Sequence, residues 1–509
     1  MDVNFIIVDA KSFIFVPYPK YDSNSGTTIN AKVRDKNLMG TLATLDGDLY
    51  ALFRNDDWKN PEIKGEFNIT KLLIGDTSFS IKLKTTSKWG EKDPSYYYLG
   101  TTVTNIPFFF NTWFNLDTYV EKYGEGSLVK LSSTYNGIKF NGIGITPSIS
   151  SYIYTTVPSA NYLTPAVSVS GINLWGNSIS LSSSVKFMKT KDSEYKSFAP
   201  VYFEQNIRTY FGGEFLKGVS HATTVKYTPK TSIDVLNSMS YALTGTTTIH
   251  LLEDIYMNVE GDVKYFDTGV GISQNMTIGK NFTITPKLCE YLRSTITETG
   301  LDFSRFYTLS ASSSKSTINW KGNFREGFAY KVSISETWNA DMSSKKATSI
   351  IDHVEFTYFK LFGNWFNPSF RVIFNQQINN SSYGYIFSTT GDVGEQVRGV
   401  LNKNIRSNNQ FAAVFNMNLL TVFPMPKLFD FADYYASVFF DCAVVKANAS
   451  SEFEHYYGFG VEGVGIFKEY PSYPIRLSIG FDLERLSLWL KDEGPSNFYE
   501  IFFGLDFFF

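Results

Sequence analysis

The sequence ends in Tyr499-Glu500-Ile501-Phe502-Phe503-Gly504-Leu505-Asp506-Phe507-Phe508-Phe509, and this stretch decides the fold class. Counted back by twos from its last residue, every position is apolar, so the stretch predicts a strand with one continuous apolar face. Its length is about that of a tilted strand that crosses the hydrocarbon of a bilayer. At the edge of a soluble sheet such an aromatic strand would promote aggregation, whereas a closed barrel has no edge. The stretch therefore predicts the closing strand of a membrane β-barrel, with a buried strand of a soluble protein as the alternative.

The two-residue period continues through the rest of the chain. Residues 475–484 alternate between apolar and polar without a break, and similar segments, separated by turn-forming clusters, recur along the sequence. Aromatic residues make up 17% of the chain, with 46 Phe and 32 Tyr, while charged residues make up only 19%. A membrane barrel needs apolar and aromatic side chains outside and polar side chains inside, whereas a soluble core would use more Val, Leu and Ala.

These patterns predict an all-β protein, a transmembrane antiparallel β-barrel of about 16 strands with long extracellular loops. No linker or step in composition divides the chain, so we expect a lead-in segment over residues 1–24 and one barrel over residues 25–509. Residues 60–390 exceed what 16 strands require, and there we expect the long loops or else extra strands. The N-terminal residues lack the cationic region of a secretory signal. We therefore expect that a signal was removed or that further sequence precedes Met1.

Composition and motif content argue against several classes of function. A net charge of −3 and a pI near 6.0 give no basic surface for nucleic acid, and no apolar run is long enough for a transmembrane helix. The histidines are scattered, without the spacing of metal ligands or of a catalytic triad. They are His221, His250, His353 and His455. We expect no enzyme activity, no metal and no cofactor. Cys289 and Cys442 lie far apart in the chain and are expected to be packing residues, with a disulfide as the alternative.

The C-terminal strand also looks like the signal by which outer-membrane barrels are recognised for assembly. In that signal a glycine is followed by alternating aromatic residues that end at the carboxyl terminus, and Gly504, Phe507 and Phe509 fit this pattern. Phe502 stands where a polar residue is usual. The stretch thus predicts a location in the bacterial outer membrane.

An ordered set of motifs occupies the last quarter of the sequence. Val397-Arg398-Gly399 comes first, then Phe439-Phe440-Asp441, then residues 463–467 followed by Pro474-Ile475-Arg476-Leu477. Strands are predicted after the first motif at about 410–423, 434–446, 453–467, 474–488 and 497–509. This order resembles the BamA/TamA-like (bacterial surface antigen) superfamily, in which a V/I-R-G-F/Y motif at the tip of the sixth extracellular loop precedes the last five strands.

The resemblance implies a role for each residue of the first motif. In the family the loop folds into the barrel and its arginine meets acids of the inner wall. Carried over, Arg398 pairs with Asp441 or with a neighbouring inward acid, Glu462 or Asp482, and Gly399 lets the backbone turn beside it. An arginine in a partly dry interior requires a carboxylate. A solvated loop arginine is the alternative.

The resemblance also implies a function. In the family the first and last strands form a seam that opens sideways and templates a client's strand, and here these strands would be Thr27 to Arg34 and Tyr499 to Phe509. The expected function is insertion, assembly or translocation of outer-membrane or secreted proteins, with lipid and client proteins as partners. A passive porin or structural barrel is the alternative, and a soluble β-rich surface protein is a third possibility. The POTRA domains usual before this barrel are not seen, so we expect a barrel-only member or a fragment.

Overall fold

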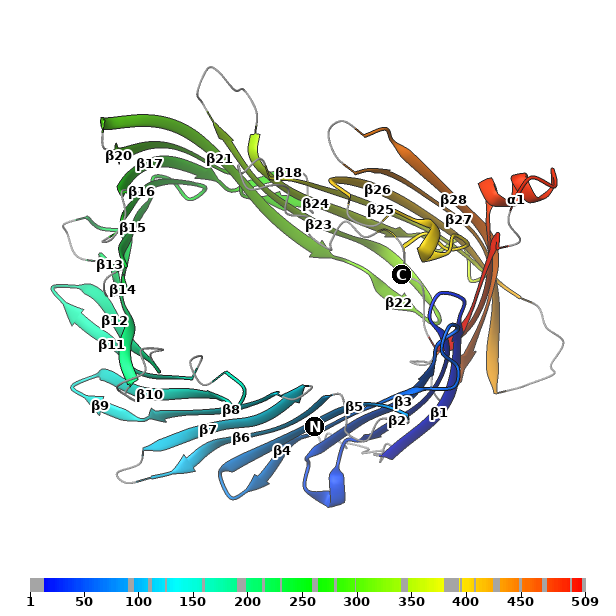
Figure 1. Ribbon diagram of the computed structural model, residues 1–509, viewed down its shortest axis with the longest axis horizontal. Coiled ribbons are helices and arrows are strands. Elements are labelled where there is room, and N and C mark those ends of the chain that lie inside the picture. The colour runs from blue at the N-terminus through cyan, green and yellow to red at the C-terminus, as the bar shows by residue number, and fades with distance from the viewer. Residues whose placement is uncertain are drawn as a thin grey trace, which may run out of the picture. The chain divides into compact units, whose positions relative to one another are not determined.

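The computed structural model describes residues 13–505 except for 90–95, 109–111, 124–125, 158–160, 190–197, 213–215, 229–230, 259–263, 279–281, 298, 340–346, 380–392, 394–395, 407–408, 424–430, 448–450, 469–473 and 495–496. The fold is all-β (Figure 1), and the chain divides into two compact units. Unit 1 contains residues 27–237, and unit 2 contains residues 20–26 and 262–509 among others. No helix in the described part of the chain is long and apolar enough to cross a membrane.

Unit 1 is a sheet of antiparallel strands in which neighbours in the chain pair with each other. Its strands are β2 (Gly26–Asp35), β3 (Thr44–Phe53), β4 (Glu62–Ile74), β5 (Thr77–Lys88), β6 (Tyr96–Pro107), β7 (Trp113–Tyr123), β8 (Gly126–Asn136), β9 (Ile138–Phe140), β10 (Ile143–Tyr154), β11 (Tyr162–Leu174), β12 (Asn177–Lys189), β13 (Phe198–Tyr210) and β14 (Val219–Thr228). A short 3-10 helix, Leu38–Gly40, connects β2 to β3. Residues of β1 (Phe13–Asp22), β15 (Ser232–Ala242) and β16 (Thr247–Asn258) fall in both units, and Gly26 of β2 falls in unit 2.

Unit 2 is also built from antiparallel strands, of which the longest, β21, has 17 residues. Its strands are β17 (Lys264–Gln274), β18 (Met276–Ile278), β19 (Phe282–Ile284), β20 (Lys287–Thr297), β21 (Gly300–Ser316), β22 (Asn319–Lys321), β23 (Phe324–Asn339), β24 (Ala347–Phe359), β25 (Phe366–Asn379), β26 (Phe411–Val422), β27 (Ala432–Lys446), β28 (Glu454–Phe467), β29 (Ile475–Asp482) and β30 (Tyr499–Leu505). Helix α1 (Leu483–Trp489) follows β29, and a 3-10 helix, Asn402–Asn404, lies between β25 and β26. Strands β18 and β19 form a separate two-stranded sheet.

The predicted number of about 16 strands is wrong. The described residues form a main sheet of 28 strands. Two of these are short continuations: β9 pairs with β10, as β8 does, and β22 pairs with β23, as β21 does. Without these two continuations the sheet has 26 strands. For residues 60–390 long loops or else extra strands were expected, and extra strands are found: the described residues of this range lie mostly in strands, the longest of 17 residues. An even number of antiparallel strands, here 26, is usual for bacterial outer-membrane barrels. The structure is therefore consistent with the transmembrane barrel that the alternation predicts, but with more strands than expected.

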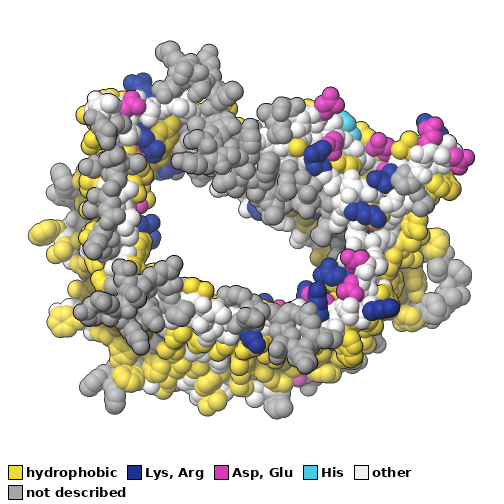
Figure 2. Space-filling view, viewed as in Figure 1, with side chains coloured by type: hydrophobic (Ala, Val, Ile, Leu, Met, Phe, Trp, Pro, Cys, Tyr) yellow, Lys and Arg dark blue, Asp and Glu magenta, His cyan; other side chains and the backbone are white. Residues whose placement is uncertain are grey.

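The two faces of each sheet have opposite chemistry. On β28 the side chain of Val461 is 51% exposed, while its neighbour Glu462 is only 6% exposed. In unit 1 the exposed face likewise carries Leu83, Leu99 and Leu131, and Figure 2 shows hydrophobic side chains gathered over β4 to β8. A soluble protein buries its apolar side chains and exposes its charges. The inverted arrangement is that of strands whose apolar face contacts lipid.

The pairing of the first and last strands is confirmed, but with a different first strand. Strand β1 pairs antiparallel with β30, with Tyr21 opposite Phe503 and Asp22 opposite Phe502. The expected first strand, Thr27 to Arg34, lies in β2, which pairs with β3. The sheet thus begins inside the segment 1–24 that was expected to be a lead-in.

The five strands expected after the Val-Arg-Gly motif are confirmed as β26 to β30. One boundary differs, because the segment expected as a strand over 474–488 ends as a strand at Asp482 and continues as α1. The side chain of Asp482 accepts a hydrogen bond from the backbone N–H of Arg485 and so caps this helix.

Candidate functional site

The loop between β25 and β26 packs on the sheet of unit 2. Its described residues, 393 and 396–406, contribute Val393, Val397 and Val400, each only 1% exposed, to an apolar cluster. The partners of these valines come from the strands beneath the loop. They are Ile373 of β25, Ala412 and Val414 of β26, and Ala443 and Val445 of β27, with Ile405 from the loop itself. Burial of these apolar side chains holds the loop down on the sheet.

The loop brings Arg398 onto Asp441 of β27. Nε and Nη2 of Arg398 donate to Oδ2 and Oδ1 of Asp441, both at 2.8 Å, and the backbone N–H of Arg398 donates to Oδ2 at 2.9 Å. Arg398 is 6% exposed and Asp441 is 0% exposed. A guanidinium and a carboxylate joined by two parallel hydrogen bonds form the strongest ion-pair geometry, which buried charges need to offset their loss of water.

The charges continue across β28 and β29. Glu462 lies between two arginines, with its Oε2 at 3.6 Å from Nη1 of Arg398 and at 3.2 Å from Nη1 of Arg476. Each guanidinium also lies over an aromatic ring, Arg398 over Phe439 at 3.9 Å and Arg476 over Phe502 at 4.0 Å. The charges of two arginines, Arg398 and Arg476, are therefore matched by those of two acids, Asp441 and Glu462, in a buried row that extends from the loop to β30.

Two glycines let the loop approach the sheet this closely. Gly399 has a φ of +90°, and a Cβ on it would come within 2.7 Å of the backbone N of Phe481. On the sheet side, a Cβ on Gly458 would overlap the carbonyl oxygen of Arg398. The loop backbone thus lies directly on the backbone of β28 and β29.

The loop is also hydrogen-bonded to the place where β1 and β30 pair. The N–H of Gly399 donates to Oε2 of Glu500 at 2.6 Å, and Nδ2 of Asn24 donates to Oε1 of the same carboxylate at 2.5 Å. The N–H of Asn402 donates to Oδ1 of Asn24 at 2.7 Å. Glu500 belongs to β30, and Asn24 belongs to the turn after β1. One hydrogen-bonded group therefore includes the loop and both strands of this junction, which we call the β1–β30 seam.

The structure brings most of the sequence-predicted site residues together. Val397, Arg398 and Gly399 are buried between the loop and the sheet, Asp441 binds Arg398, and Glu462 lies beside Arg398. The carboxylate of Asp482 is engaged elsewhere, where it caps α1 and lies 3.6 Å from Arg485.

Of the residues of the predicted assembly signal, only Gly504 belongs to the described part of the chain. Gly504 is in β30, where a Cβ would lie 3.0 Å from the ring of Phe502 and 3.1 Å from Lys20. Phe507 and Phe509 lie outside the described residues. Cys289 and Cys442 are both free thiols.

Sequence reasoning missed Glu500, Asn24 and the role of Arg476. The signal for Glu500 was present, because it is a carboxylate in a mostly apolar stretch, on the face opposite the continuous apolar one. Arg476 stands between Ile475 and Leu477, and so its place on the polar face follows from the alternation alone. Asn24 carries no such signal, since an asparagine in a turn is ordinary.

Comparison with known proteins finds only distant similarities among solved structures. No family model matches the sequence, and no curated protein matches it. Among solved structures, the chain is similar to BamA from Haemophilus ducreyi lacking POTRA domains 1–3, with 10% identity over 67% of this chain and 71% of that chain, and a TM-score of 0.27. It is also similar to OpdL from Pseudomonas aeruginosa, with 9% identity, coverages of 77% and 99%, and a TM-score of 0.30. The alcaligin outer membrane receptor FauA from Bordetella pertussis shows 8% identity, coverages of 97% and 76%, and a TM-score of 0.34. Similarity at this level does not separate an assembly barrel from a porin or a receptor.

The chemistry of the sheet faces decides the location. Exposed apolar side chains on one face, buried ionic pairs on the other and strands that pair from β30 to β1 are the properties of a lipid-embedded barrel. The protein is a bacterial outer-membrane β-barrel. Among the described residues of this barrel no group of His, Cys, Asp and Glu is arranged to hold a metal ion.

Proposed function

We propose that this outer-membrane barrel inserts or assembles other outer-membrane proteins, or translocates secreted ones, and that the β1–β30 seam is its working element. The observation that carries the proposal is the hydrogen bond from Gly399 to Glu500, because it joins the buried loop to the last strand. The loop resembles the corresponding loop of BamA/TamA-like proteins in its Val-Arg-Gly motif and in the five strands that follow. In this proposal the loop holds the seam together until a client strand replaces the contacts between β1 and β30.

Few backbone hydrogen bonds join the two strands of the seam in the described residues. Only two paired positions join β1 to β30 in the described residues, whereas seven join β29 to β30. Two further bonds come from Ser23, whose N–H donates to the carbonyl of Ile501 at 3.0 Å and whose Oγ accepts from the N–H of Ile501 at 2.8 Å.

The sequence of β1 explains why the seam is short. In a strand, alternate residues direct their N–H groups to the same neighbour. Since the N–H of Ser23 faces β30, positions 21, 19 and 17 face it too, and Pro19 and Pro17 have no N–H to donate. In the register of the seam, Pro19 would lie opposite Leu505. β1 is thus suited to be an edge strand, where proline is tolerated.

An opened seam would offer what a client needs. The exposed N–H and C=O groups of β30 would pair with an extended client strand, as in other cases of strand addition to a sheet edge. This activity forms main-chain hydrogen bonds and needs no enzyme chemistry and no cofactor. Its partners are outer-membrane lipid and client proteins, and nucleic acid has no part in it.

A passive porin or structural barrel is the second candidate. The count of 26 strands favours it, since the resemblance to assembly barrels leads to an expectation of about 16. The two functions differ in whether the seam has to open, and a covalent lock across it separates them.

The lock uses Tyr21→Cys with Phe503→Cys, which stand opposite each other across the seam. The matched control keeps Phe503→Cys but pairs it with Leu477→Cys on β29, where no opening is proposed. Cys289 and Cys442 are replaced by alanine in both chains. The purified chain is placed in lipid vesicles, and the folding of a urea-denatured eight-stranded barrel is followed by its heat-dependent shift on gels.

We expect the oxidised seam lock to slow client folding to the rate in empty vesicles, and reduction to restore it. The oxidised control should remain as active as the parent. Equal activity of the two locked chains, or no acceleration by the parent, would establish the passive barrel instead.

A further inference from the structure

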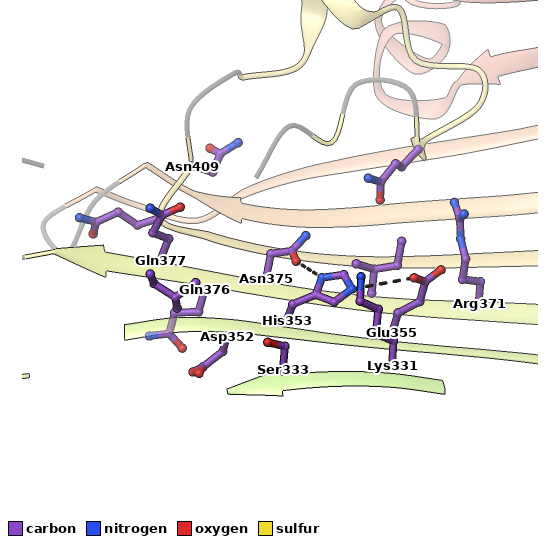
Figure 3. A pocket seen from close by; sticks show the side chains of 14 residues that line it. Lys331, Ser333, Asp352, His353, Glu355, Arg371, Asn375, Gln376, Gln377 and Asn409 are labelled. Atoms are coloured by element: carbon purple, nitrogen blue, oxygen red, sulfur yellow. Dashed lines mark hydrogen bonds and ion pairs between the residues drawn. The ribbon is translucent and has the colours of Figure 1, made fainter. Parts of the chain in front are cut away.

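We infer that unit 2 carries a binding site for a neutral, hydroxyl-rich ligand of the sugar class, in a cavity between β23 to β25 and the loop that holds Arg398. This inference goes beyond the proposed function and does not rest on it, because no described residue of β1 or β30 is among those that line the cavity. The cavity has a volume of about 530 Å³, within the usual size of a small-molecule site (Figure 3).

The walls of the cavity are unusually rich in side-chain amides. Six carboxamides line it, three from β25 and three from the loop and the residues just before β26. They are Asn375, Gln376, Gln377, Gln396, Asn409 and Gln410. A carboxamide offers a donor and an acceptor side by side, and so it fits a pair of neighbouring hydroxyl groups.

Some of these polar groups are buried without a partner. Asn409 and Gln410 are 4% and 5% exposed, yet Oδ1 of Asn409 and Nε2 of Gln410 have no hydrogen-bond partner among the described residues. Both residues are held firmly, since Nδ2 of Asn409 donates to the carbonyl of Arg406 at 2.8 Å and the N–H of Gln410 donates to the carbonyl of Lys446 at 3.0 Å. Buried polar atoms are nearly always satisfied, and so these two atoms call for a polar group inside the cavity.

His353 adds a third such atom on the opposite wall. Figure 3 shows its ring between Asn375 and Glu355. Its Nδ1 lies 2.6 Å from Oδ1 of Asn375, which fixes the ring, while its Nε2 has no hydrogen-bond partner in the described chain and lies 3.9 Å from Oε2 of Glu355. The three atoms are an acceptor, a donor and a ring nitrogen that can be either. A hydroxyl group serves all three, since it both donates and accepts.

The charges of the lining point to a ligand without net charge. Two cations, Lys331 and Arg371, are matched by two acids, Asp352 and Glu355. The described lining contains no Phe, Tyr or Trp, so it offers no ring for a nucleobase to stack on. Among the described residues of the lining only Ile351 and Ile373 have apolar side chains.

The test is calorimetric titration of the full chain with glucose, sucrose and maltotriose, and with glucose 6-phosphate as a charged counterpart. The chain is kept in lauryldimethylamine oxide, because a maltoside detergent would itself present sugar to the site. We expect saturable binding of at least one neutral sugar, and affinity at least about tenfold lower in Asn409→Ala and in Gln410→Ala.

Two further variants keep the inference falsifiable. Ser333→Trp fills the cavity from an exposed position of β23 and should abolish binding without disturbing a buried residue. Asn319→Ala removes an exposed amide elsewhere in the same unit and should change nothing. Each variant is first shown to shift on heating in gels as the parent does.

Three results would overturn the inference. The first is no saturable heat from any of the three neutral sugars up to roughly 50 mM. The second is binding that persists in Ser333→Trp, which would put the sugar elsewhere. The third is tighter binding of glucose 6-phosphate than of every neutral sugar, which would make the site an anion site.

Discussion

The N–H of Gly399 lies 2.6 Å from the Oε2 atom of Glu500 and donates a hydrogen bond to it, although the two residues are 101 positions apart in the chain. Arg398, the residue just before Gly399, is bound to Asp441. The buried ion pair and the seam are therefore connected through neighbouring residues of the loop. A change in the ion pair should therefore reach the seam through a single peptide unit, and a change at the seam should reach the loop in the same way.

The first prediction concerns the ion pair. Replacing Arg398 by alanine leaves the carboxylate of Asp441 buried without its partner, and we expect a loss of about 3–5 kcal/mol in folding free energy. Lysine at this position should recover only part, because an ammonium group cannot form the two parallel bonds. The measurement is the urea midpoint of the heat-dependent gel shift. Arg406→Ala removes the exposed pair with Glu454 in the same loop and is the matched control, with a midpoint close to that of the parent. Equal midpoints for both alanine variants would contradict the prediction.

The second prediction concerns the contact between loop and sheet. Gly458→Ala places a methyl group where the carbonyl oxygen of Arg398 lies, and so the loop should lift from β28. Val400→Cys reports this, because the native valine is buried and a thiol there should react slowly with a water-soluble maleimide. We expect much faster labelling in the presence of Gly458→Ala. Gly463→Ala is the control, since a Cβ there would meet nothing within 4 Å. Labelling that is equally slow in both variants would show that the loop tolerates the methyl group.

Much of this arrangement follows from the sequence, for physical reasons that differ between its parts. The alternation of apolar and polar residues predicts strands and faces, and so β26 to β30 and the buried position of Glu462 were foreseen. The order of the motifs was sufficient to place Arg398 on Asp441. The number of strands could not be predicted, because the alternation describes each segment only locally. Every short turn in residues 60–390 can either end a strand or interrupt one.

The seam was mislocated for a local reason. The resemblance placed the first strand at Thr27 to Arg34, and so the segment that contains β1, with Pro17 and Pro19, was expected to be a lead-in. In the structure the same two residues belong to β1, whose described pairing with β30 ends at Tyr21. The bonds of Asn24 and Glu500 join segments 476 residues apart and depend on register, which no local pattern specifies.

The third prediction concerns the lipid-facing side of the sheet. Val461 lies near the middle of β28 with half of its side chain exposed, and an arginine there would have to be held in hydrocarbon. We expect Val461→Arg to destabilise the folded barrel by about 2–4 kcal/mol in vesicles, as judged by the urea midpoint. Leu490→Arg changes an exposed leucine just after α1, outside the strands, and should have little effect. If Val461→Arg were as stable as Leu490→Arg, this face of β28 would not be in contact with lipid.

The fourth prediction concerns the acid that joins loop and seam. Glu500→Ala removes the acceptor of both Gly399 and Asn24, so Asn24 and the loop lose their bonds to β30, while Ser23 keeps its bonds to Ile501. Hydrogen exchange followed by mass spectrometry should then show faster exchange in peptides that cover residues 20–26 and 396–406. Glu493→Ala, at an exposed acid between α1 and β30, is the control and should leave both peptides unchanged. Faster exchange in only one peptide would show that loop and seam are not coupled through Glu500.

The fifth prediction tests whether the missing donors of β1 keep the seam weak. Pro19→Ala restores an N–H that faces β30, and in the register of the seam it would donate to the strand near Leu505. We expect slower hydrogen exchange in residues 499–505 and, where client folding depends on opening, a slower rate of client folding in vesicles. Pro147→Ala is the matched control, because Pro147 is also inside a strand, β10, but pairs with Val167 of β11 far from the seam in sequence. Both variants gain a donor and lose the rigidity of proline, so a difference between them isolates the seam. A Pro19→Ala chain that protects residues 499–505 and yet folds the client at the parental rate would place the activity away from β1 and β30, whereas unchanged protection would show that the proline is not what keeps this ladder short.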